Sequence, residues 1–124
     1  MSPRRGFTLI ELLVVMAILA LLLSIAAPRF IASLDAAREA ALQTNLRVLR
    51  ESIDRYRADT GQYPETLQAL VDSRYLRSVP VDPVTDRMDS WVVTAHPDGI
   101  TPGIHDVRSG ATGNARSGVA FSSW

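Results

Sequence analysis

Cysteine and lysine are both absent from this chain of 124 residues. Without cysteine, neither a disulfide nor a cysteine-ligated metal site is possible, so packing, neighbouring subunits or an ion must hold any domain together. Every basic residue is arginine, and the 13 basic side chains balance 13 acids. That balance gives no electrostatic case for binding nucleic acid. The length allows one small domain beside a membrane segment, and not two.

Charge is also nearly absent from residues 7–27, where Glu11 is the only ionisable side chain. About 20 helical residues cross the hydrocarbon core of a bilayer, so this run is long enough to span a membrane. A carboxylate inside it opposes insertion by about 2.5–3.5 kcal/mol, and charges within membranes usually have a partner and a task. Arg4 and Arg5 precede the run, and positive flanks stay cytoplasmic. We therefore expect one crossing, with a cytoplasmic N-terminus and the remainder in the periplasm or outside.

The sequence Gly-Phe-Thr-Leu-Ile-Glu at residues 6–11, followed by an apolar stretch and Pro28, resembles the prepilin class of type IV pilins and type II secretion pseudopilins. The resemblance implies that a prepilin peptidase cuts between Gly6 and Phe7 and methylates the new amine, giving N-methylphenylalanine. It also implies that Glu11 pairs with the N-terminal amine of an adjacent subunit during assembly. Phe7 and Glu11 are four positions apart, which puts both on one helix face. The alternative is that Glu11 only reaches the membrane surface or becomes neutral.

The same resemblance implies a division of the chain into three parts. Residues 1–6 are the leader that is cleaved, and residues 7–27 are a transmembrane helix that becomes the filament core. Residues 28–124 are then a periplasmic domain anchored in the inner membrane. The fold class expected is α+β, with a long N-terminal helix whose second half packs on a small antiparallel sheet, as in pilins.

Beyond residue 27 the sequence pattern predicts the outline of that domain. Pro28 removes one helical hydrogen bond, so we expect a kink or local melting there. A helix to about residue 58 carries an apolar seam at 4-3-4-3 spacing, formed by Leu42, Leu46, Leu49, Ile53 and Tyr56. A short helix to about residue 73 and two strands at residues 91–95 and 104–109, joined as a hairpin, follow. The remaining segment is loop-like, with a final aromatic that docks back.

Several segments of the second half, including residues 59–64, 79–83 and 104–110, resemble the G-type pseudopilins of type II secretion. Members of that subfamily commonly bind calcium in a C-terminal loop rich in Asp. Residues 112–124 contain no acid here, and calcium prefers six to eight oxygens, several of them from carboxylates. Asp106 and Ser109 are the remaining calcium candidates and make a poor set, so we expect no bound cofactor.

Other constellations have simpler interpretations. His96 and His105 lie beside acids in the sequence, but histidines that flank turns are usually surface residues. The arginines of residues 47–57 alternate with acids at i,i+4 spacing, which predicts a solvated helix face rather than a nucleic-acid site. No phosphate-binding loop and no catalytic group can be named.

We therefore expect a structural subunit and no enzyme. It would polymerise, with copies of itself and with other pseudopilins, into the periplasmic pseudopilus of a type II secretion system and drive protein export. Its other partners would be prepilin peptidase, membrane lipid before assembly, and an inner-membrane assembly platform with a separate ATPase. The alternative within the same family is a minor type IV pilin of a surface pilus, for adhesion, motility or DNA uptake. A third alternative, a membrane-tethered enzyme or binding module, needs a pocket with converging polar groups, and the sequence offers none.

Overall fold

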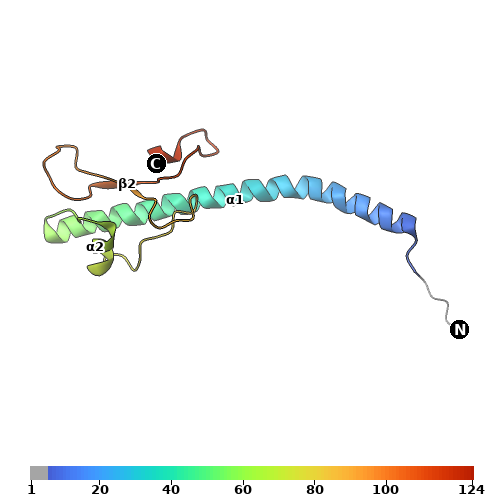
Figure 1. Ribbon diagram of the computed structural model, residues 1–124, viewed down its shortest axis with the longest axis horizontal. Coiled ribbons are helices and arrows are strands. Elements are labelled where there is room, and N and C mark those ends of the chain that lie inside the picture. The colour runs from blue at the N-terminus through green and yellow to red at the C-terminus, as the bar shows by residue number, and fades with distance from the viewer. Residues whose placement is uncertain (1–5) are drawn as a thin grey trace. The chain divides into compact units, whose positions relative to one another are not determined.

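The computed structural model describes residues 6–124 (Figure 1). Arg4 and Arg5, on which the expected orientation in the membrane rests, lie outside the described residues. The chain divides into two compact units, of which the first ends at Asp35 and the second is Ala36–Trp124. Each unit is described by itself.

One α-helix, α1 (Leu9–Thr60), passes through both units. It ends at Gly61, whose backbone N–H donates to the Arg57 carbonyl at 2.9 Å and whose φ is +76°. Only glycine adopts that backbone conformation without steric cost, so this residue is suited to stop the helix. The helix predicted to end near residue 58 is confirmed.

Pro28 lies inside α1, and the helix continues through it without a break. The missing proline N–H leaves the carbonyl of Ser24 without its usual helical donor. The Ser24 hydroxyl donates to the Leu21 carbonyl at 2.6 Å, one turn earlier. The melting expected at Pro28 is therefore not a feature of this structure, and a kink there stays a prediction.

The core of the second unit is the predicted seam of α1. Leu42, Leu46, Leu49 and Ile53 are each at most 2% exposed, and full burial of one such side chain contributes about 1.5–3 kcal/mol. The side chains that cover the seam come from the rest of that unit, namely Leu70, Leu76, Trp91, Ile104, Val107, Ala111, Ala115 and Phe121. Tyr56 is partly buried against the same cluster. The seam interpretation is confirmed.

A short helix, α2 (Leu67–Asp72), follows the turn after α1. Thr66 caps it, since its hydroxyl accepts from the Ala69 backbone N–H at 3.1 Å, and threonine is a favoured cap residue. Leu70 is fully buried, while Leu67 and Val71 are partly buried against the core. Both the helix and its inward face match the prediction.

The sheet of the second unit has two antiparallel strands, β1 (Val92–Thr94) and β2 (Asp106–Arg108). Their register pairs Val93 with Val107. Figure 1 shows β2 and the C-terminal segment drawn along the second half of α1, and Val107 is fully buried in the shared core. The predicted hairpin and the α+β, pilin-like fold class are confirmed. The C-terminal segment closes with a short 3₁₀ turn, η1 (Phe121–Ser123), so the expected loop contains one ordered turn.

Candidate functional site

The start of α1 is closed by a reciprocal pair of hydrogen bonds between Thr8 and Glu11. The Thr8 hydroxyl accepts from the Glu11 backbone N–H at 3.2 Å, and the Glu11 Oε2 atom accepts from the Thr8 backbone N–H at 3.3 Å. This arrangement is a capping box, in which a Thr and a Glu three residues apart satisfy two free backbone donors. The carboxylate also lies in the first turn, at the positive end of the helix, where an acidic side chain is stabilising.

Apolar side chains surround this carboxylate in the first unit. A surface hollow there is lined by Ile10, Glu11, Val14 and Val15. Phe7, just before the cap, is 93% exposed. The polar end of the helix therefore stands beside aliphatic side chains, and within residues 6–35 nothing covers them or the Phe7 ring.

The apolar residues of the first unit are exposed all round α1. Leu9 is 76% exposed, and Leu21 is 64% exposed. α1 contains a window long and apolar enough to cross a membrane, and none of that window is buried within the protein. Exposure on that scale is not stable in water, so lipid or other protein must cover this length of helix.

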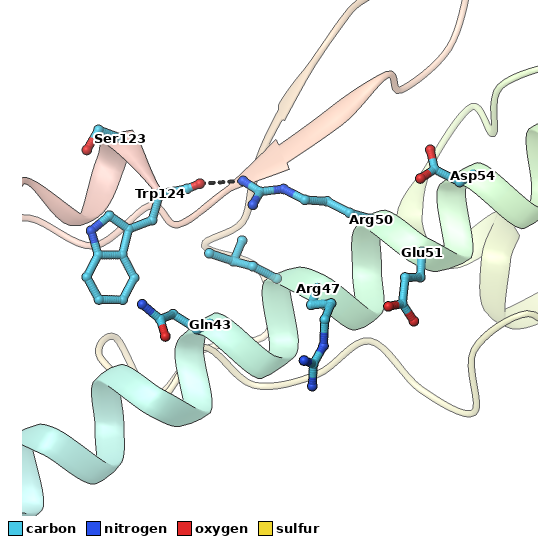
Figure 2. Close-up of a pocket in the computed structure, with 8 residues that line it drawn as sticks. Gln43, Arg47, Arg50, Glu51, Asp54, Ser123 and Trp124 are labelled. Carbon is cyan, nitrogen blue, oxygen red and sulfur yellow. Dashed lines mark hydrogen bonds between the residues drawn. The ribbon is translucent and has the colours of Figure 1, made fainter.

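In the second unit, Arg50 links three separate stretches of chain. Its Nε atom donates to Asp106 Oδ1 at 2.9 Å, and its Nη2 atom donates to the Val107 carbonyl at 3.0 Å and to the Trp124 carbonyl. Figure 2 shows this guanidinium turned toward Trp124, while Arg47 points away from it. A groove with a volume of about 540 Å³ lies beside the contact. It is lined by charged side chains of α1, namely Arg47, Arg50, Glu51 and Asp54, and by Trp124.

A second arginine, Arg116, attaches the C-terminal segment to α1 at Glu39, nearer the N-terminus of the helix than Arg50. The backbone N–H of Arg116 donates to Glu39 Oε1 at 2.7 Å, and its Nε atom donates to Glu39 Oε2 at 3.1 Å. The backbone hydrogen bond from Arg116 is the main reason that the pKa of Glu39 is lowered. Both oxygens of one carboxylate are thus engaged by one residue.

The two expected calcium candidates are occupied by other contacts. Asp106 faces the positive guanidinium of Arg50, which opposes a cation at the same place. The Ser109 hydroxyl donates to Asp82 Oδ2 at 2.6 Å and accepts from the Ala111 N–H at 3.1 Å. Among the described residues, no group of three His, Cys, Asp or Glu side chains has the arrangement of a metal site. The donor set does not fit calcium.

His96 and His105 do come together, with ring centroids 4.7 Å apart. His96 Nδ1 lies 3.1 Å from Asp98 Oδ1. Asp98 organises the turn between the strands, because it accepts from the Thr101 hydroxyl at 2.6 Å and from the backbone N–H of Ile100 and Thr101. These bonds, led by that from the Thr101 hydroxyl, hold the pKa of Asp98 well below its usual range.

The charged face of α1 is solvated, as its i,i+4 spacing predicts, because Arg47, Glu51, Asp54 and Arg55 are all exposed. In the part of the chain that the structure describes, Arg50 pairs with Asp106, not with Asp54. Glu51 is likewise not within ion-pair distance of its neighbours Arg47 and Arg55 among those residues. Arg50 is turned instead toward β2 and the C-terminal segment, where the Asp106 carboxylate and the Val107 and Trp124 carbonyls all accept from its guanidinium.

Sequence reasoning missed three positioning contacts, made by Thr8, Asp82 and Glu39. Thr8 was identifiable from the Thr-x-x-Glu pattern that defines a capping box. Asp82 is fully buried, and besides Ser109 it binds the backbone N–H of Val84 at 2.9 Å. The Asp-Pro sequence does indicate that Asp82 caps its turn, but no local signal marks its bond to Ser109, 27 positions later, or the contact of Glu39 with a residue 77 positions away.

Comparisons with known proteins match both units. The prokaryotic N-terminal methylation motif matches residues 1–27, and the type II secretion system protein G family matches residues 29–91. A type II secretion system core protein G of Klebsiella pneumoniae is 33% identical over 99 residues, covering 67% of this chain and 71% of its own. The core protein G of Pseudomonas aeruginosa is 32% identical over 96 residues, covering 64% and 68% respectively. That of Vibrio cholerae is 31% identical over 98 residues, covering 67% of each. No solved structure matches.

Proposed function

This chain belongs to the type II secretion system protein G family, and from that premise we propose that it is a pseudopilin, a structural subunit that polymerises into a periplasmic pseudopilus for protein export. The family is one of structural secretion proteins rather than known enzymes. The matching relatives are core proteins of secretion systems, which favours export over the surface-pilus alternative.

One observation carries the proposal. The apolar length of α1 in the first unit is uncovered all round, while the apolar seam of the same helix in the second unit is buried. A helix of the first kind needs lipid or a bundle of similar helices around it. We infer that the subunit waits in the inner membrane as a single-pass protein and moves into the filament core on assembly.

Maturation precedes assembly in this proposal. A prepilin peptidase cuts after Gly6 and methylates Phe7, in agreement with the methylation motif that matches residues 1–27. Gly6 has no side chain, and a Cβ built on it meets nothing within 4 Å. The scissile peptide is therefore open on that side, which suits an extended backbone in a protease cleft.

Glu11 then sets the register between subunits. In the single chain its carboxylate accepts a bond at 3.3 Å from the Thr8 backbone N–H, a donor without net charge. The methylated amine of a neighbouring subunit carries a full positive charge, so both partners of the new bond are charged and a Coulombic attraction is added. Because the surroundings are apolar, the attraction is also little screened. Assembly thus exchanges an internal bond for a stronger bond between subunits.

The remaining partners of the proposal follow from what the chain lacks. Its sequence contains no nucleotide-binding loop, so the energy for assembly comes from a separate ATPase acting through an inner-membrane platform. The N-terminus faces the cytoplasm and the second unit faces the periplasm, because Arg4 and Arg5 flank the apolar run.

The test uses the full chain in a bacterial host that carries prepilin peptidase and the assembly platform. We expect mass spectrometry to find a mature chain that begins at Phe7 with one added methyl group. Glu11→Gln should still be processed, while its filament yield falls by more than about tenfold because the amine of the neighbour is left buried and unpaired.

Glu65→Gln is the matched control, because Glu65 is an exposed acid of the second unit and forms no ion pair among the described residues. Its filament yield should equal that of the unchanged chain. A normal yield from Glu11→Gln would contradict the register role. A mature chain that begins at Met1 would contradict the proposal as a whole.

A further inference from the structure

The C-terminal segment, residues 110–124, is the part of this chain that differs most from what family resemblance implies. The resemblance implies a loop that calcium holds closed, and such a loop needs several carboxylate oxygens. Residues 110–124 contain no acidic side chain. Something else must therefore hold the segment against the core.

The segment is nonetheless ordered and packed. Phe121 is 9% exposed, and its ring packs edge-on against Trp124 with centroids 5.4 Å apart. The Phe121 backbone N–H donates to the Gly113 carbonyl at 3.2 Å, and the Ala115 N–H donates to the Val119 carbonyl at 2.8 Å. These bonds give the segment its own shape, but they do not join it to α1.

Apolar packing makes part of that connection, because Ala111, Ala115 and Phe121 lie in the same core cluster as the seam of α1. Two arginine contacts add the polar part. Arg50, on α1, reaches both β2 and the Trp124 carbonyl with one guanidinium (Figure 2). Arg116, on the segment itself, engages both oxygens of Glu39 on α1. The Glu39 side chain is only 15% exposed, so this pair is partly shielded from water and from salt. The two contacts lie at separate points along the helix and hold the segment at both.

We propose that these two contacts replace a bound calcium ion, so that residues 110–124 close onto α1 without any divalent cation. The positive charge that calcium would supply in a loop of acids comes here from guanidinium groups, and the acids are on α1 and β2. Folding and protease resistance of the second unit then depend on Arg50 and on the Glu39–Arg116 pair, and not on calcium. The inference concerns the folded subunit, so it stands whether or not filaments form.

The first test compares calcium with a chelator. The full chain in detergent micelles is treated with trypsin, and cleavage after Arg116 is followed by mass spectrometry. We expect the same cleavage rate and the same thermal unfolding midpoint in calcium and in EDTA. If calcium slows the cleavage and raises the midpoint in a saturable way, a metal site exists and the proposal is wrong.

The second test removes each contact. Arg50→Gln should speed cleavage after Arg116 by about tenfold, because the loss of a charged hydrogen bond shifts local opening by that order. Glu39→Gln should speed it by a few-fold, since the amide oxygen still accepts from the Arg116 N–H. If Arg50→Gln prevents folding, Glu39→Gln alone carries the test.

Two matched controls lie on the same helix. Arg47→Gln and Glu51→Gln change residues that have no ion pair among the described residues, and both should cleave at the rate of the unchanged chain. If the variants and their controls cleave equally fast, the arginine contacts do not hold the segment and the proposal fails.

Discussion

The length of α1 before Asp35 and the length after it are both rich in leucine, yet the structure exposes one set and buries the other. Leu21 is 64% exposed, whereas Leu49 is 0% exposed. The first length is apolar on every face, and among the described residues of its unit it meets no other helix or strand. The second length is apolar along a seam that the rest of its unit covers. The distribution of apolar residues around a helix, rather than their number, thus indicates its surroundings.

The largest effect on stability is expected when one leucine of each length of α1 is replaced by alanine. Leu49→Ala should lower the free energy of unfolding of the second unit by about 2–5 kcal/mol, because it leaves a cavity in the core. Leu21→Ala should leave it unchanged in detergent micelles. Urea unfolding followed by tryptophan fluorescence measures both, and equal effects would contradict the division of roles.

Two glycines give the next largest contrast. A Cβ at Gly110 would lie 1.9 Å from the Ser90 carbonyl oxygen, so Gly110→Ala should lower the free energy of unfolding by about 1–3 kcal/mol through overpacking. Gly6→Ala has free space and should leave unfolding unchanged while slowing proteolytic maturation. The same urea experiment, together with mass spectrometry of the mature chain, checks the pair. A stable Gly110→Ala variant would show that the backbone at Ser90 can move aside.

A smaller effect is expected at the start of α1. Thr8→Val should destabilise the first helical turn by about 1 kcal/mol, since the hydroxyl cap is lost while the side-chain volume is kept. Thr44→Val is the control, because its hydroxyl only donates to the Ala40 carbonyl within the helix. Hydrogen exchange of the amides of residues 9–12 in micelles should speed up in Thr8→Val alone. No change there would mean that the capping box does not hold the first turn.

The smallest effect is the response of the second unit to acid. The folded state lowers the pKa of Asp98 and of Glu39, so their stabilising contribution is complete above the ordinary carboxyl pKa of about 4. That contribution is lost as the pH falls through the lowered folded values. The thermal midpoint should therefore be flat from about pH 7 to 5 and decline below about pH 4. In Asp98→Asn the thermal midpoint should fall less steeply below about pH 4. If it falls as in the unchanged chain, other carboxyl groups cause the acid response.

The elements that local spacing encodes were predictable from the sequence. The seam through Leu46 and Leu49, the short helix ending near residue 73 and the hairpin all follow from residue periodicity and turn residues, and the structure confirms them. The N-terminal motif likewise pointed to Glu11 without any structure. Such features depend on residues a few positions apart, where geometry is fixed by the backbone itself.

The contacts that fasten the second unit were not predictable. Arg50 had an acid at i+4 in Asp54 and still pairs with Asp106, 56 positions away. Asp82 is fully buried in its turn, where its carboxylate accepts a hydrogen bond from the hydroxyl of Ser109, 27 positions later. In each case the partner of a polar side chain depends on which distant segments of the chain the fold brings together. The spacing of residues along the sequence does not predict that partner.

The position of Arg50 also bears on the order in which the subunit folds. Its three bonds join residues that are 56, 57 and 74 positions apart, and the entropy lost on closing a loop grows with its length. Short-range structure forms sooner than such long closures, so these bonds should be made last. A newly synthesised chain would then leave the seam through Leu46 and Leu49 uncovered for an interval. Chaperones or neighbouring chains would meet that surface before the C-terminal segment does.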